Sequence, residues 1–192
     1  MEETPQERFQ RMTQEAQESE ELVCHYLESK HGFGFHLVSH ELQKIGKDNG
    51  WHVPDIHSKK NPKTTIEVKE DLMCGNTGNI AIEEHCLLRL KAWGQAHKKN
   101  NMFLAYVNHR DFRVDFFRCG HDVDYLRKEL EWLCVFRPDC KEVQGGDSGL
   151  KLWIIPLKVA RSLKSNITLS IMDELDQIAF SFIAKRKLTR EK

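Results

Sequence analysis

The apolar run MFLAYV at residues 102–107 constrains the fold more strongly than any other segment of the 192-residue chain. It has the length and composition of a β-strand that is buried on both faces of a sheet. Such a strand needs a layer of helices on each side, because both of its faces carry apolar side chains. The sequence therefore predicts an α/β (α+β) protein in which helices flank a small mixed sheet.

Four segments have the three- and four-residue periodicity of amphipathic helices. The first covers residues 5–30 and is expected to end at Gly32, because glycine readily adopts the left-handed conformation of a C-terminal cap. The others are predicted at 80–100, at 121–134 and from about 167 to 187, before a basic tail.

Strand-like runs lie between these helices. WHVPDI at 51–56 and TTIEVKE at 64–70 predict a hairpin joined by HSKKNPK, and residues 41–50 predict a loop or one helical turn. Further strands are predicted at 33–39, 102–107, 113–118 and 151–156. No linker or repeat divides the chain, so residues 1–192 are interpreted as a single domain.

Composition narrows the class of protein without naming a partner. Lys plus Arg equals Asp plus Glu, at 29 each, so no overall charge attracts a polyanion. The N-terminal MEETPQERFQ has no signal-peptide pattern, and no run approaches the roughly 18 to 20 apolar residues of a membrane span. We therefore expect an intracellular protein with no membrane partner. The six cysteines include no CxxC pair, which disfavours a zinc ribbon and a secreted disulfide framework.

The strand at 64–70 contains the most informative charges. Residues two apart in a strand point to the same face, so Glu67 and Lys69 project together while Ile66 and Val68 serve the core. The preceding hairpin strand brings Asp55 to the charged face. Two carboxylates are suitable ligands for Mg²⁺ or Mn²⁺, and a lysine beside them could orient or deprotonate a water or stabilise charge on a phosphate.

The spacing of these residues resembles a known nuclease motif. Pro54-Asp55, eleven intervening residues and then Glu67-Val68-Lys69 are similar to the signature of the PD-(D/E)XK nuclease superfamily. The resemblance covers about residues 15–110 and implies a restriction-endonuclease-like αβββαβ core, with residues 111–192 as a C-terminal extension of strand and helices. It implies hydrolysis of nucleic-acid phosphodiester bonds by a metal-activated water.

The resemblance also assigns roles to residues. Asp55 and Glu67 would bind Mg²⁺ or Mn²⁺, the carbonyl of Val68 would be a further ligand, and Lys69 would be the catalytic lysine. Resolvase-type members add a glutamate from the first helix, which would be Glu21 or its neighbour Glu20.

Two accessory residues depend on the branch of the superfamily. The stretch EDLMCGNTGNIAIEE after Lys69 is similar to phage-type members, in which a second acidic residue would be Glu83. The helix that ends near Gln95 is closer to restriction-type and resolvase-type members, so both branches stay open.

Basic residues near the motif are candidates for contacts with the phosphate backbone. These residues are Lys59, Lys60, Arg89, Lys98 and Lys99. The resemblance favours DNA over RNA as the partner, and a homodimer is compatible with an enzyme that cuts both strands.

Other functions fit the same motif. Viral cap-cleaving RNA endonucleases share this core, and a nuclease-like fold without catalysis could serve as a nucleic-acid-binding or assembly module. An exposed strand face with a surface ion pair would also produce the ExK string. The sequence does not separate endonuclease from exonuclease, or one metal ion from two.

Overall fold

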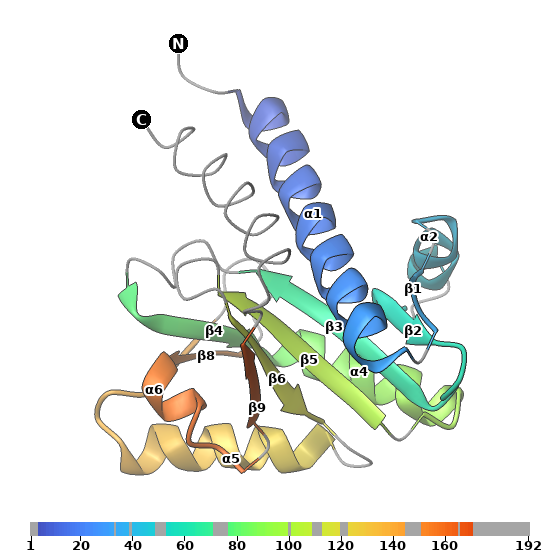
Figure 1. The fold of residues 1–192 in the computed structure, drawn as a ribbon. Helices are drawn as coiled ribbons and strands as arrows, with labels where there is room; N and C mark the ends of the chain where they lie inside the picture. Colours follow the sequence, from blue (N-terminus) through green and yellow to red (C-terminus); the bar gives the residue numbers. More distant parts are fainter. Residues whose placement is uncertain are drawn as a thin grey trace.

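The structure is a computed structural model that describes residues 4–32, 34–38, 40–48, 53–70, 77–99, 101–108, 113–119, 123–144, 151–164 and 166–170. The elements are, in chain order, α1 (Pro5–His31), β1 (Phe35–Leu37), α2 (His40–Asp48), β2 (Ile56–Ser58), β3 (Thr64–Glu70), β4 (Asn79–Glu83), α4 (Glu84–Ala96), β5 (Asn101–Asn108), β6 (Arg113–Arg118), α5 (Val123–Phe136), β7 (Lys141–Gln144), β8 (Lys151–Pro156), α6 (Leu157–Ala160) and β9 (Asn166–Ser170). The prediction of helices that flank a mixed sheet is confirmed (Figure 1).

The strands form two sheets. The larger has six strands in the order β1-β2-β3-β5-β6-β9, and the smaller has three in the order β4-β8-β7. In the larger sheet β3 and β5 are parallel, whereas the other neighbouring strands are antiparallel. The crossover from β3 to β5 contains α4, as a parallel pair of strands requires.

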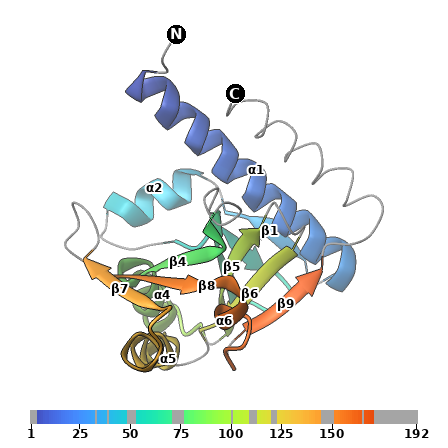
Figure 2. The same ribbon diagram turned by 90° about the vertical axis from the view of Figure 1, so that its left-hand side faces the viewer.

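Helices cover both faces of the large sheet. Side chains of β5 alternate between them, with Ala105 and Val107 in the core beneath α1 and Leu104 and Tyr106 in the core with α4 and α5. Figure 1 shows α1 lying across one face, and Figure 2 shows the small sheet and α5 away from α1. The strand predicted from the run at 102–107 is therefore buried on both sides, as expected.

Helix α1 has well-defined ends. Thr4 and Glu7 form a capping box, and Pro5 occupies the first turn, where a missing N–H costs no hydrogen bond. At the other end Gly32 has φ of 54° and donates its N–H to Glu28 O. The predicted end of the helix is therefore confirmed.

Helix α4 approaches β5 closely at Gly94. A Cβ added there would overlap Sδ of Met102, whose side chain is buried. Glycine at this position therefore lets the helix backbone lie against the sheet.

Several predicted boundaries are wrong. Residues 41–48 continue the nine-residue helix α2, and the predicted strand 51–56 has no strand at residues 53–55, because β2 begins at Ile56. The predicted helix 80–100 begins only at Glu84, because the residues before it pair with β8. The helix predicted from 167 is a strand as far as Ser170, where it pairs with β6, and the rest of that segment lies outside the described residues.

Two elements, β7 and α6, were not predicted. Among the described residues, no helix combines the length and apolar character needed to cross a bilayer.

Candidate active site

The charged residues of β3 face α4. In the parallel pairing with β5, Glu67 lies opposite Leu104 and Lys69 lies opposite Tyr106, so these side chains share the α4 face. Ile66 and Val68 belong to the core beneath α1. The predicted division of the strand into an apolar face and a charged face is therefore correct.

Asp55 lies at the edge of β3, just before β2 begins. The β2–β3 ladder includes the pair Ile56–Ile66. Asp55 directly precedes Ile56 in the chain. Its carboxylate accepts, through Oδ2, a hydrogen bond from Val68 N at 2.7 Å. Gln43 Nε2 of α2 donates to Oδ1 at 3.1 Å. The side chain of Asp55 thus satisfies an N–H of β3 and is held from two sides.

Glu67 and Lys69 form an ion pair between a buried and a half-exposed group. Lys69 Nζ lies 2.8 Å from Glu67 Oε1, and the two side chains are 39% and 1% exposed, respectively. The thiol of Cys86 in α4 lies 3.8 Å from the same oxygen. Glu67 is therefore fixed by its own strand and by the helix that crosses behind it.

The electrostatics of the site are dominated by carboxylates. Burial, Glu67 and Glu20 raise the pKa of Asp55 well above its usual range, against the opposing effects of Val68 N–H and Lys69. Burial alone would lower the pKa of Lys69, but the adjacent Glu67 carboxylate outweighs it and raises the pKa above its ordinary value. Lys69 is therefore an ammonium at neutral pH in a site where acidic groups outnumber basic ones.

Of the two candidate glutamates on α1, Glu20 is the one whose charge acts on Asp55. Glu20 is half-buried, and its charge raises the pKa of Asp55. Glu21 is exposed and accepts a hydrogen bond from Gln17 at 3.2 Å. One turn of helix carries both residues, so the angle between adjacent side chains decides which of them reaches the site. A second link from α1, between Ser19 Oγ and Glu70 Oε2 at 2.9 Å, holds the helix against the end of β3.

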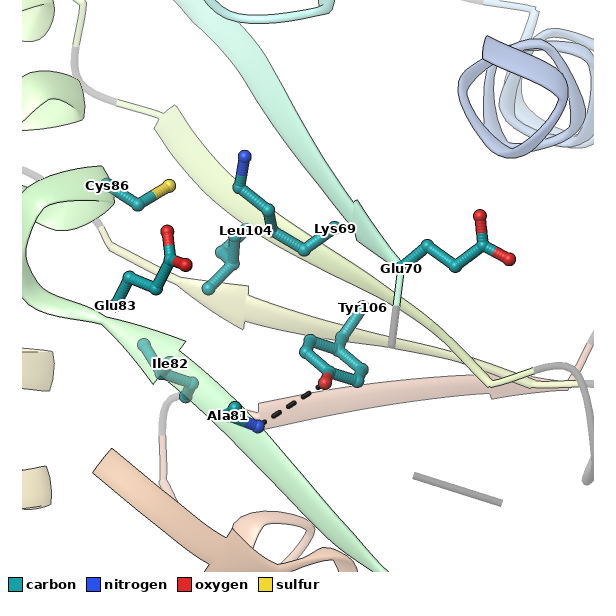
Figure 3. A pocket seen from close by; sticks show the side chains of 8 residues that line it. All are labelled: Lys69, Glu70, Ala81, Ile82, Glu83, Cys86, Leu104 and Tyr106. Carbon is teal, nitrogen blue, oxygen red and sulfur yellow. Dashed lines mark hydrogen bonds between the residues drawn. The ribbon is translucent and has the colours of Figure 1, made fainter. Parts of the chain in front are cut away.

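A pocket of about 230 Å³ opens beside Lys69 (Figure 3). Its lining comes from β3, β4, α4 and β5, and consists of Lys69, Glu70, Ala81, Ile82, Glu83, Cys86, Leu104 and Tyr106. Glu83, an accessory candidate from the sequence, lines this pocket. Gln95, the other candidate, is exposed in the last turn of α4, nine residues and about 13 Å along the helix axis from Cys86.

The predicted phosphate-binding residues are not brought to the site. Lys59 and Lys60 lie in the β2–β3 turn, which precedes Lys69 along β3 by about 20 Å of extended chain. Lys60 Nζ donates to Gly32 O, and Lys99 Nζ donates to Pro62 O, so both amines bind the protein itself.

The remaining basic candidates lie on α4 and in the turn after it. Lys98 lies in the turn after α4, next to Lys99, which contacts the β2–β3 turn at Pro62. Arg89 is exposed on α4 itself.

The donors available for a metal ion are oxygen atoms. Across the described ranges, no three side chains of His, Cys, Asp or Glu gather in a geometry that would hold an ion. The ligand set expected from the sequence, the carboxylates of Asp55 and Glu67 with the carbonyl of Val68, contains only two such side chains, and a hard cation bound by it would keep several waters.

Sequence reasoning missed Gln43 and Cys86 at the site. Gln43 lies in a segment for which the sequence predicts a loop or one helical turn, and neither prediction indicates that its side chain points toward Asp55. Cys86 lies within the predicted helix 80–100, and nothing in the local sequence indicates that its buried thiol contacts Glu67 of β3.

No protein-family model, curated protein or solved structure matches the chain. The functional assignment therefore depends on the fold and on the chemistry of the site.

Proposed function

We propose that the protein is a nuclease of the PD-(D/E)XK type, dependent on Mg²⁺ or Mn²⁺, that hydrolyses phosphodiester bonds, with DNA as the preferred substrate. The observation that carries this proposal is the convergence of Asp55, Glu67 and Lys69 on the second half of β3. The order of elements supports it. Helix α1, the antiparallel strands β1, β2 and β3, helix α4 and the parallel strand β5 occur in the order of an αβββαβ core, with α2 inserted between β1 and β2 and β4 inserted between β3 and α4.

The carboxylates fit a divalent cation. Burial, Glu67 and Glu20 raise the pKa of Asp55, so the ionised carboxylate lies in a site that a bound cation would stabilise. Asp55, Glu67 and the carbonyl of Val68 would hold the ion, and oxygen donors of this kind suit Mg²⁺ and Mn²⁺. When bound, the cation would supply a Lewis acid that lowers the pKa of a water and neutralises charge on the phosphate.

Lys69 acts as an ammonium. Its raised pKa means that it does not accept a proton near neutral pH, so it serves as a hydrogen-bond donor to developing negative charge. Its side chain is 39% exposed, which lets it reach a substrate while Glu67 fixes its direction. Of the roles considered from the sequence, the structure favours stabilisation of charge over removal of a proton from water.

Asp55 is oriented by the protein before any ligand arrives. Val68 N and Gln43 Nε2 each bind one of its oxygens, which holds the carboxylate plane in place. Each carboxylate oxygen has a second lone-pair direction that remains for a ligand. Orientation of this kind limits the entropy lost when an ion and a substrate bind.

A cleavage assay tests the proposal. Labelled duplex DNA, single-stranded DNA and single-stranded RNA are incubated with the protein in Mn²⁺ and in chelator, beside the variants Lys69→Ala and Asp55→Asn. We expect cleavage of DNA in Mn²⁺ alone and a loss of at least about 100-fold in each variant. Lys44→Ala, at an exposed position on α2, is the matched control and should cleave normally.

Two results would contradict the proposal. Cleavage that persists undiminished in folded Lys69→Ala protein removes the role assigned to the lysine. Absence of cleavage in wild-type protein on all three substrates, together with unchanged melting in Mn²⁺, favours a catalytically inactive module instead.

A further inference from the structure

The pocket beside Lys69 has an apolar floor. Ile82, Leu104 and Tyr106 are each 1% exposed, and Cys86 is 3% exposed, so these side chains form a largely apolar inner surface. The hydroxyl of Tyr106 accepts a hydrogen bond from Ala81 N at 3.3 Å, which fixes the aromatic ring against β4 (Figure 3).

The rim of the pocket is charged, but its charge does not suit an anion. The carboxylate of Glu67, 2.8 Å from Lys69 Nζ, offsets the positive charge that the lysine brings to the rim. Glu70 points away from the other lining residues in Figure 3, and its carboxylate binds Ser19 at 2.9 Å. The carboxylate of Glu83 faces the pocket, so a phosphate there would meet like charge.

The chemistry of floor and rim selects a flat, uncharged group with a hydrogen-bond donor. Glu83 Oε2 lies 3.3 Å from His85 Nδ1, and the carboxylate is among the groups that line the pocket. A carboxylate accepts from an exocyclic amine, as an acidic side chain accepts from N4 of cytosine. The volume of about 230 Å³ is below the range of pockets that hold drug-sized ligands, which suits one small ring system.

We propose that this pocket receives one unstacked nucleobase that carries an exocyclic amino group, next to the phosphodiester bond that is cut. The inference rests on the proposed nuclease function and names its substrate class. Cytosine and adenine would be preferred over thymine, because thymine has no amino group for Glu83. A base reaches such a pocket only when it leaves the stack, so the preferred substrate is single-stranded or unpaired at the cleavage position.

Binding without metal separates this inference from catalysis. Fluorescently labelled DNA oligonucleotides of eight deoxycytidines, eight deoxyadenosines or eight thymidines are titrated with wild-type protein in chelator at one fixed salt concentration. A duplex of mixed sequence is titrated in parallel, and binding is followed by fluorescence anisotropy. We expect the cytosine and adenine strands to bind at least about fivefold more tightly than the thymine strand and the duplex, the effect of one net hydrogen bond.

Two variants show whether the pocket causes the preference. The glutamine in Glu83→Gln can donate a hydrogen bond as well as accept one, so it can bind thymine as well as cytosine. The Kd values of the cytosine and thymine strands should then agree to within about twofold. Ala81→Leu fills the pocket from the half-exposed strand β4, and should remove the preference for single strands. Glu41→Gln and Ala16→Leu change exposed residues on α2 and α1, and should leave both ratios as in wild type.

The outcomes are distinct. Equal binding of all strands by wild-type protein overturns the inference, as does a preference that survives in Glu83→Gln protein with a normal melting temperature. Metal-dependent cleavage without the preference leaves the nuclease proposal intact and removes the base pocket. The preference without cleavage removes the nuclease proposal and leaves a binding pocket for unpaired bases.

Discussion

Lys69 Nζ lies 2.8 Å from Glu67 Oε1, joining a lysine that is 39% exposed to a glutamate that is 1% exposed. Such a pair is costly to break from one side, because the buried partner keeps its charge after the other is removed. The lysine therefore stabilises the fold locally in addition to its proposed role in cleavage.

The variant Lys69→Met should lower the free energy of unfolding by about 1–3 kcal/mol, since it leaves the Glu67 carboxylate without its ammonium. Adding Glu67→Gln removes the buried charge and should restore most of that loss, although neither protein would cleave DNA. Urea unfolding of both single variants and the double variant measures the coupling. Simple additivity of the two single effects would show that the ion pair contributes nothing to stability.

Asp55→Asn should stabilise the protein at pH 7. The pKa of Asp55 is raised above its ordinary value of 3.8, first by burial and then by Glu67 and Glu20. The folded state therefore binds the proton more tightly than the unfolded state. The contribution of Asp55 to the free energy of unfolding therefore falls as pH rises from about 4 through the folded-state pKa.

Asparagine has no such charge and keeps an acceptor for Val68 N. We expect the melting temperature at pH 7 to rise by about 2–4 °C, which corresponds to about 1 kcal/mol for a chain of this size. Asp48→Asn, at an exposed position on α2, is the control and should melt as wild type. A lower melting temperature for Asp55→Asn would mean that its charged hydrogen bonds outweigh the repulsion.

Mn²⁺ should raise the melting temperature of wild-type protein, because an ion that binds only the folded state stabilises it by about 2.7 kcal/mol at 100 times its Kd. Glu20→Gln should reduce this shift, whereas Glu21→Gln should not, because only Glu20 acts on Asp55. The two adjacent glutamates are therefore a matched pair. Equal shifts in both variants would exclude α1 from the metal site.

Acid should weaken the fold through His57. Its pKa is lowered to about 4, mainly by burial and then by Lys99, His36 and His97. Between pH 6.5 and about 4 the unfolded state takes up a proton that the folded state resists, so stability falls as pH falls.

His57→Phe keeps a ring next to Trp93, whose centroid lies 5.7 Å from that of His57, and removes the titration. The substitution is made in Asp55→Asn protein, because Asp55 itself makes the fold more stable as pH falls and would mask the effect of His57. The double variant should lose less stability between pH 6.5 and 4 than the Asp55→Asn single variant. Chemical unfolding across that range measures the slope, and His25→Gln on the exposed face of α1 is the control. Identical slopes would place the acid sensitivity elsewhere.

The sequence predicts correctly those features that depend on backbone geometry within a few residues, such as the two faces of a strand and the end of a helix. The two-residue period of β3 separated Ile66 and Val68 from Glu67 and Lys69, because pleating alone decides which way side chains point. Gly32 marked the end of α1 for an equally local reason, the left-handed backbone.

Long-range pairing decided the rest. The segment before α4 was predicted as helix because Ile82, Cys86 and Leu90 are spaced by four residues, yet Ile80 and Ile82 also alternate as in a strand. Pairing with β8 selects the strand, and that partner lies some 70 residues away. The choice of Glu20 over Glu21 likewise depends on how α1 is rotated on the sheet, which no local pattern specifies.

The close contact between Gly94 and Met102 has a consequence for the other end of α4. An α-helix is stiff over two or three turns, so the distance at which its C-terminal end rests on β5 sets the height of its first turn above β3. That first turn carries Cys86, which touches Glu67. A methyl group at Gly94 would therefore push the C-terminal end of α4 away from β5 and tilt the helix. The tilt would shift Cys86 relative to Glu67, the proposed catalytic glutamate, although the substituted position is more than 10 Å away.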